Sequence, residues 1–163
     1  MNMPVDGLVG LGAAEDHLRE VALFVALHLG RAPGVLWPEC DHPLLGDGGD
    51  GAAGAERTDA LAASPDVTVL AAQIAATTGL AARPAPAGTP PGHLLVHQFA
   101  GAATWTVAGP AGDGRDASLR YRLRAGEVLY VPDGWSRAAE PTAGACWTVV
   151  VLDPDAPETP ATD

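Results

Sequence analysis

Residues 126–137, GEVLYVPDGWSR, decide the fold prediction for this chain. Gly126 is a residue type at which a chain turns readily, and Val128–Val131 is a run of residues with high β propensity. Residues 132–134, Pro-Asp-Gly, are a strong signal for a tight turn. The stretch therefore predicts a short strand and a sharp turn, after which the next inward-facing side chain is that of Arg137.

The chain from His93 onward is a series of short β-rich runs separated by Gly, Pro and Asp residues. The runs recur at roughly 10-residue spacing, which is typical of a β-sandwich or barrel. They are HLLVHQF (93–99), TWTVAG (104–109), SLRYRLR (118–124), EVLYVP (127–132) and CWTVVVLD (146–153).

The N-terminal half has a different pattern. Apolar residues at helical spacing predict a helix over 14–29, with Gly30 as its C-cap, and a short strand over 34–37. Residues 67–79 fit either a short helix or a strand followed by a helix. The prolines of 82–92 exclude both a helix and a central strand.

These patterns predict one domain over residues 14–152. It is preceded by an extension over 1–13, interrupted by a flexible Gly- and Ala-rich loop over 44–66, and followed by a disordered acidic tail over 153–163. A chain of 163 residues, 47% of them hydrophobic, suits a single small core.

The charge balance narrows the classes of partner. The net charge is −11, and all nine basic residues are Arg. Such a chain repels phosphate backbones and anionic membrane surfaces, so we expect neither nucleic acid nor membrane as a partner. The N-terminus lacks the pattern of a signal peptide, so we expect a cytoplasmic protein. The only cysteines, Cys40 and Cys146, are far apart and do not indicate a disulfide framework.

Two stretches resemble a known family. Residues 126–137 resemble the second cupin motif. Residues 88–107, GTPPGHLLVHQFAGAATWTV, resemble the first half of the JmjC-type signature. The positions in register are Pro91, Gln98, Gly101 and Trp105. The resemblance implies a mostly β, small cupin-type double-stranded β-helix (jelly-roll) barrel with an N-terminal helix and one or two short helices. Since JmjC-like relatives often dimerise, it also implies a homodimer.

The same resemblance implies that the family's chemistry is lost. JmjC enzymes hold Fe(II) with two His and one carboxylate and anchor 2-oxoglutarate with a Lys. In this register the metal positions fall at Gly88, Pro90 and Arg137, and the Lys position falls at Ala103. Gly and Pro have no ligating side chain, and a guanidinium offers no free lone pair. We therefore expect a degenerate domain with no metal and no cofactor, which is not an Fe(II)/2-oxoglutarate oxygenase.

His93 and His97 are four residues apart and share one face if the segment is a strand. The family register points Leu94, Val96 and Gln98 inward, which places both histidines on the outer face. Partly exposed or hydrogen-bonded histidines are the favoured interpretation. A binding or acid–base role and metal ligation remain alternatives. The neighbouring residues Cys40, Asp41 and His42 fit a loop better than a metal site, because adjacent side chains diverge.

Three functions remain open. The favoured function is binding of a small acid or a peptide, with Arg137 as a carboxylate clamp, although pairing of Arg137 with Asp133 or Glu140 is a competing interpretation. The side chains expected to line such a pocket are Arg137, Gln98, Tyr130 and Tyr121. A second possibility is a structural partner of another protein, for instance a biosynthetic enzyme, with tryptophans as interface anchors. Of these, Trp135 is expected to be exposed, and Trp105 and Trp147 to be in the core.

The alternative to a binding or partner protein is a cofactor-independent enzyme, such as an isomerase, epimerase or cyclase. Such an enzyme needs a general base with a tuned pKa. His93 and His97 are the candidates for that role, with Asp133 and Glu127 as further carboxylates nearby.

Overall fold

Two antiparallel sheets make up most of the computed structural model, which describes residues 6–45, 65–85 and 91–155. The larger sheet has the strand order β1-β6-β3-β8-β2, and the smaller has the order β5-β4-β7. The strands are β1 (Gly34–Leu36), β2 (Ala81–Ala85), β3 (His93–Ala100), β4 (Ala102–Pro110), β5 (Asp116–Arg124), β6 (Val128–Val131), β7 (Ser136–Pro141) and β8 (Cys146–Asp153). The helical elements are α1 (Asp6–His28), the 3-10 turn η1 (Pro43–Leu45) and α3 (Pro65–Thr78).

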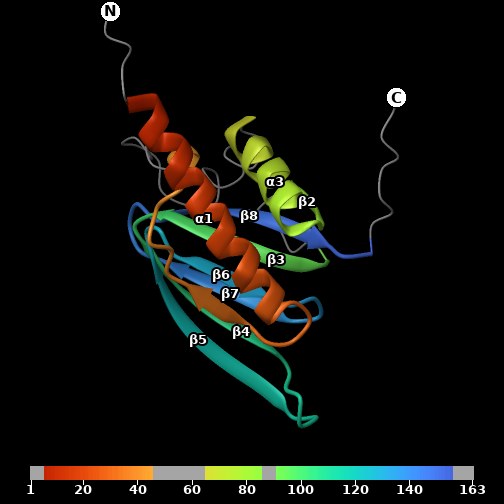
Figure 1. Cartoon of the computed structure of the whole chain (residues 1–163). Helices are drawn as coiled ribbons and strands as arrows, with labels where there is room; N and C mark the ends of the chain where they lie inside the picture. The colour runs from red at the N-terminus through yellow and green to blue at the C-terminus, as the bar shows by residue number, and fades with distance from the viewer. Residues whose placement is uncertain (1–5, 46–64, 86–90, 156–163) are drawn as a thin grey trace, which may run out of the picture.

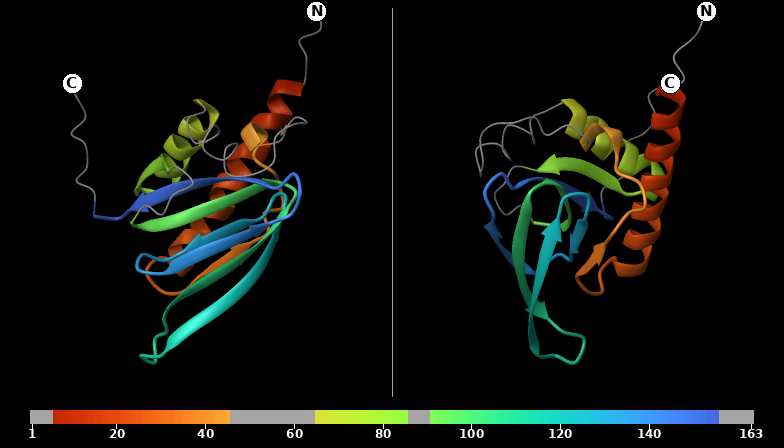
Figure 2. Two further views of the ribbon diagram at one scale, coloured as in Figure 1. Left: turned by 180° about the vertical axis from the view of Figure 1, so that it is seen from behind. Right: turned by 90° about the vertical axis from the view of Figure 1, so that its left-hand side faces the viewer.

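The elements are arranged in three layers. Helices α1 and α3 lie on one face of the larger sheet, and the smaller sheet lies on its other face (Figures 1 and 2). The central strands β3, β6 and β8 are therefore covered on both faces, and nearly every residue in them is buried. This double burial explains why their sequences are nearly continuous apolar runs.

The space between the two sheets is filled by side chains. Trp105 from β4 and Trp147 from β8 meet edge to face, with ring centroids 5.2 Å apart. Trp135 fills a further part of the interior, against the backbone of Gly109, where a Cβ atom would lie 2.5 Å from the indole ring. Aliphatic residues from six of the strands complete this core: Ala85, Leu94, Val96, Ala103, Val107, Leu123, Leu129, Val131, Val149 and Val151.

A second core lies between the helices and the larger sheet. The helices contribute Leu18, Val21, Phe24, Val25, Leu70, Ala71 and Ile74, and the sheet contributes Leu95, Val128, Tyr130, Val150 and Leu152. Leu94 and Leu95 thus belong to different cores, as the alternation of side chains in a strand requires.

The helix–strand pattern follows the sequence prediction, with one open alternative resolved and two differences. Helix α1 begins at Asp6, within the segment expected as an extension, and ends at His28, where Gly30 follows with φ +68°. Residues 65–78 form a helix, which resolves the two alternatives for that segment. Strand β7, 136–141, was not predicted, because SRAAEP has neither β-branched nor aromatic residues.

The proline-rich segment enters the sheet only at its edge. β2 contains Pro84 and pairs with β8 alone, as expected for a strand that contains proline. Most of the predicted loop (46–64), residues 86–90 and most of the predicted tail (156–163) lie outside the described residues. Within the described residues, no helix is both long enough and apolar enough to cross a membrane.

Candidate functional site

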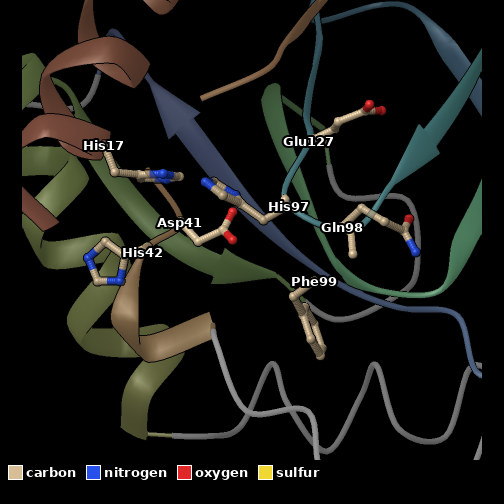
Figure 3. A pocket seen from close by; sticks show the side chains of 9 residues that line it. His17, Asp41, His42, His97, Gln98, Phe99 and Glu127 are labelled. Atoms are coloured by element: carbon tan, nitrogen blue, oxygen red, sulfur yellow. The ribbon is translucent and has the colours of Figure 1, made fainter. Parts of the chain in front are cut away.

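A small pocket lies where α1, the segment before η1, the end of β3 and the turn between β5 and β6 meet (Figure 3). Its volume is about 110 Å³. The residues that line it are His17, Asp41, His42, His97, Gln98, Phe99, Ala125, Gly126 and Glu127. They include three histidines and two carboxylates, and none of them is basic at neutral pH.

His17 comes from α1 and is held in one tautomer. It lies on the buried face of the helix, one turn before Val21, and is 2% exposed. Its Nδ1 is 2.9 Å from the backbone oxygen of Cys40. Because a carbonyl oxygen only accepts, Nδ1 carries the hydrogen and Nε2 carries a lone pair. Nε2 is buried and has no hydrogen-bond partner. Burial lowers the pKa of this imidazole, partly offset by the Cys40 carbonyl and nearby carboxylates.

His42 is also buried, but both of its ring nitrogens are used. The backbone N–H of Leu44 donates to Nδ1 over 3.2 Å, so Nε2 carries the hydrogen. Nε2 then donates to Oε1 of Gln73 on α3 over 2.9 Å. Burial and the neighbouring His17 lower the pKa of His42. His42 is therefore a neutral residue that ties its loop to α3.

His97 has the most unusual surroundings of the three. It lies on β3 between Val128 of β6 and Thr148 of β8, on the sheet face that the helices cover. It is 1% exposed, and neither of its ring nitrogens has a hydrogen-bond partner. Burial, reinforced by His17 and His42, lowers its pKa to about 3. The ring is therefore neutral at physiological pH.

The carboxylate of Asp41 is placed by the turn at Gly126. A Cβ atom on Gly126 would lie 2.7 Å from Asp41 Oδ1, and Gly126 has φ +92°, which favours glycine. The turn is tied to the end of β3, because Gly126 N–H donates to the Gln98 carbonyl over 2.7 Å and Gln98 N–H donates to the Glu127 carbonyl over 3.0 Å. These bonds keep Asp41 beside the strand that carries His97.

The pocket is rich in hydrogen-bond acceptors. His17 Nε2 and Gln98 Oε1 are acceptors without a partner, and a neutral His97 adds one acceptor and one donor. Gln98 Nε2 is already used by the Ala100 carbonyl at 2.8 Å. With the carboxylates at its rim, the pocket suits a small cation or hydrogen-bond donor and would repel an anion.

The sequence prediction for His93 and His97 is right in orientation. Leu94 and Val96 belong to the core between the sheets, and the two histidines lie on the opposite face. His93 is hydrogen-bonded as expected, since its Nδ1 accepts from the Tyr130 hydroxyl at 2.8 Å. For His97 the favoured expectation of exposure or hydrogen bonding is wrong, because helix α1 covers it without supplying a bond.

The four side chains expected to line one binding pocket do not come together. Gln98 lines the histidine pocket, and Arg137 lies at one end of the barrel, in a recess of about 280 Å³ with Leu94 and Trp135. The pKa of Arg137 is lowered by burial. Glu140, which was considered as an alternative partner of Arg137, pairs with Arg120 at 3.3 Å.

Of the two tyrosines of that set, Tyr130 faces away from the barrel interior, whereas Tyr121 packs against the core between the sheets. Tyr130 points to the helices, where its hydroxyl accepts from Gly30 N–H at 2.9 Å. Its place follows from alternation, because Leu129 and Val131 occupy the barrel side of β6. Tyr121 lines a groove between β1 and β5, beside Trp37.

The predictions for the tryptophans and cysteines are partly right. Trp105, Trp147 and Cys146 are buried, as expected. The prediction that Trp135 is an exposed interface anchor is wrong, because its side chain is 9% exposed and packs over Gly109. Trp37, at 73% exposure, is the exposed tryptophan. Both cysteines are free thiols.

His17 was missed as a site residue, although the sequence contains a signal for it. It precedes Val21 by four residues and therefore belongs to the apolar stripe of the helix, where a polar side chain is buried. Asp41 and His42 were assigned to a loop, which is correct, but the loop folds back onto α1 and α3. Only the tertiary structure brings these residues next to His97.

Comparison with known proteins supports the fold. No family model and no curated protein matches the chain. Among solved structures, it is similar to the ribosomal oxygenase YcfD from Escherichia coli in complex with cobalt and 2-oxoglutarate. The TM-score is 0.50 at 15% identity, over 83% of this chain and 51% of that one. A vicilin from Solanum melongena is similar over 40% of this chain and 18% of its own, with a TM-score of 0.33 and 29% identity.

These likenesses concern the fold. The chain spans about half the length of YcfD or less. Together with the two antiparallel sheets, the likeness to YcfD confirms the predicted mostly β, cupin-type jelly-roll barrel. The activities of these proteins belong to them and are not transferred by a fold match.

Proposed function

We propose that this protein is a degenerate JmjC-like barrel that acts as a binding or partner protein and not as an Fe(II)/2-oxoglutarate oxygenase. The observation that carries the proposal is the packing of the barrel interior, although a recess of about 280 Å³ remains at the end that carries Arg137. Trp105, Trp135 and Trp147 occupy the space between the sheets, with the aliphatic side chains around them. An oxygenase of this family needs that space for its iron, its 2-oxoglutarate and its reacting group.

The residues at the family's functional positions support the same conclusion. Ala103, at the Lys position, is fully buried and lies opposite Leu123 in the neighbouring strand. Arg137, at the position of the last His ligand, carries a permanent positive charge that repels a divalent ion. Gly88 and Pro90 lie outside the described residues, but neither residue type has a side chain that ligates metal.

Exposed apolar side chains support the partner role. Trp37 is 73% exposed, and Leu23 and Leu27 on the outer face of α1 are 62% and 66% exposed. Leu23 and Leu27 are one turn apart and form a continuous apolar strip on the helix. Such side chains are typical anchors of protein interfaces, and a protein or peptide partner is the class that suits them. A second copy of this chain is one such partner.

The oxygenase half of the proposal is tested by adding Fe(II), ascorbate and 2-oxoglutarate to the purified chain and measuring succinate. YcfD in parallel serves as the positive control. We expect no succinate above the enzyme-free blank. Iron-dependent succinate formation would overturn the proposal, whereas iron that binds without turnover would not.

The partner half is tested in cells of the source organism with a photo-crosslinking phenylalanine at Trp37. The control places the same group at Arg115, which is exposed at the tip of the turn between β4 and β5. We expect a discrete crosslinked species from position 37 that is absent from position 115. Identical crosslinking at both positions would mean that Trp37 contacts no specific partner.

A second function, a cofactor-independent acid–base enzyme, is favoured by one observation. His17 presents a neutral Nε2 lone pair to a pocket, and the Cys40 carbonyl fixes its tautomer, as an oriented general base requires. The size of the pocket weighs against it, since about 110 Å³ is well below the roughly 300–1,000 Å³ of ordinary substrate sites. Deuterium exchange into a small uncharged ketone such as dihydroxyacetone, lost in His17→Gln, would support this function. No exchange would exclude it for substrates of that size.

A further inference from the structure

We propose that His17 and His97 together bind one divalent transition-metal ion of the zinc class, on the helix side of the larger sheet. This site is separate from the family's iron position. His97 lies on the face of β3 opposite to Leu94 and Val96, which face the barrel interior. The inference goes beyond the proposed function and does not depend on it.

The first argument is the availability of lone pairs. Nε2 of His17 is a buried lone pair without a partner, and the other nitrogen of that ring donates to a backbone carbonyl at 2.9 Å. This is the arrangement of histidines that ligate metals, in which the second ring nitrogen donates to a carbonyl and fixes the ring. His97 adds a lone pair from a ring whose two nitrogens both lack a partner.

The second argument is the geometry of the two rings. Figure 3 shows the two rings next to one another, with the His97 ring extending toward His17. The ring centroids are 5.9 Å apart. Two imidazoles bound to one ion at Zn–N distances of about 2.0–2.1 Å place their ring centres roughly 5–6.5 Å apart, depending on the angle at the metal. The observed separation therefore accommodates one ion without movement of the backbone.

His42 provides a contrast at nearly the same distance. Its ring centroid is 5.5 Å from that of His17, in an edge-to-face arrangement. Both of its nitrogens are occupied, one by Leu44 N–H and the other by Gln73. The distance between the rings therefore does not identify the ligands. We assign His17 and His97 as ligands because their ring nitrogens have no other partner.

The third argument is charge. Asp41 and Glu127 border the pocket, and no arginine is among the residues that line it. Two neutral imidazoles beside carboxylates give a divalent ion both nitrogen ligands, which suit zinc, and compensating charge. The described residues hold no group of three or more His, Cys, Asp or Glu side chains arranged as a metal site. The ion would therefore have two protein nitrogens, one fewer than the three protein ligands of zinc sites with an open position, and water would occupy its other positions.

The pocket has room for this arrangement. A volume of about 110 Å³ corresponds to nearly four water molecules at roughly 30 Å³ each. It is too small for most organic ligands, as argued above. An ion with its remaining water ligands matches both the size and the excess of acceptors.

The test uses the full chain, stripped with a chelator and dialysed, and titrates it with Zn²⁺ against a chromophoric indicator and with Co²⁺ by absorbance. We expect saturation at about one ion per chain at micromolar metal, with visible Co²⁺ bands. His17→Leu and His97→Leu should each weaken binding by about 100-fold or more, because each removes half of the protein ligands. No saturation in the unmodified chain would overturn the proposal.

Two matched controls change histidines on the same elements that do not line the pocket. His93→Leu changes the other histidine on the same face of β3, and His28→Gln changes a histidine of α1 whose Nδ1 lies 3.2 Å from the Ala32 carbonyl oxygen. Both should retain zinc affinity within about threefold. Equal losses in the controls would contradict the assignment of the ligands.

A ring-nitrogen NMR measurement keeps the test independent of whether the variants fold. In the unmodified chain, zinc should shift the ¹⁵N resonances of His17 Nε2 and one nitrogen of His97. The ¹⁵N resonances of His42 and His93 should change little when zinc is added. Shifts confined to His28 or His93 would place the ion elsewhere and refute the site.

Discussion

Replacing His97 by Leu in the metal-free protein is expected to increase stability. His97 is 1% exposed, and neither ring nitrogen has a hydrogen-bond partner. A buried polar group without a partner costs about 1–3 kcal/mol, and an apolar side chain of similar size avoids that cost. We therefore expect the free energy of unfolding to rise by about 1–3 kcal/mol. The backbone bonds of β3 to β6 and β8 are unaffected by the substitution.

The measurement is urea-induced unfolding in mildly alkaline buffer with a chelator, followed by tryptophan fluorescence. The midpoint should rise with an unchanged dependence on urea concentration, since the surface exposed on unfolding does not change. His93→Leu is the matched control on the same strand face. Its Nδ1 accepts hydrogen bonds from the Tyr130 hydroxyl and from Asp133 N–H, so that variant should lose about 1–2 kcal/mol.

Zinc is expected to remove or reverse most of the difference in stability between the two proteins. A ligand at about 100 times its dissociation constant stabilises the folded state by about 2.7 kcal/mol. The unmodified chain should gain this amount, and His97→Leu should gain none. If His97→Leu instead lowers stability by more than about 1 kcal/mol without metal, the nitrogens of His97 are bonded in solution. The reason for assigning them to a ligand would then be wrong.

Two further predictions concern the packing that positions the pocket. Tyr130→Phe removes two hydrogen bonds of the buried hydroxyl and should lower the free energy of unfolding by about 1–2 kcal/mol in urea unfolding at neutral pH. Burial raises the pKa of Tyr130 above its ordinary value of 10.0, so its contribution is complete below that pH and is lost as the pH rises further. The variant should therefore show a weaker alkaline loss of stability, and an equal loss would contradict this cause. Gly101→Ala should cost more than about 1 kcal/mol, because Gly101 has φ +60° and a Cβ would lie 2.7 Å from Ala145 Cα. Thermal unfolding measures this loss of stability. Gly112→Ala is the control, because a Cβ at Gly112 meets nothing within 4 Å and little change is expected.

The sequence predicted the fold well where local pattern and burial agree. The β-rich runs after His93 became strands, and the helix ending before Gly30 has the expected left-handed glycine after it. The pattern around residues 126–137 placed β6 and its turn correctly. Strand β7 was missed, because its small and polar residues carry no propensity signal, and only pairing with β4 makes them a strand.

The candidate site was predicted poorly for a physical reason. Its side chains come from four segments between residues 17 and 127, and no local pattern reports which segments meet. The family resemblance also directed attention to the barrel interior. Tyr130 was placed there although its neighbours on β6 alternate the other way, and Trp135 was expected to be exposed because its turn is polar. The space above Gly109, which accepts the indole ring, is visible only in the tertiary structure.

The packed barrel interior and the histidine pocket are connected through strand β3. Both faces of its central part are covered, so a polar side chain there, such as that of His97, is shielded from bulk water. On the barrel side the chain carries Leu94 and Val96, which pack as a core requires. On the helix side it carries His97, where a leucine would be more stable by the argument above. Proteins keep such locally unfavourable residues mainly at functional positions. His17 lies opposite this residue, and its lone pair is directed into the same pocket. One ion bound by both histidines explains both unpaired side chains, whereas otherwise each would need a separate explanation as a packing defect.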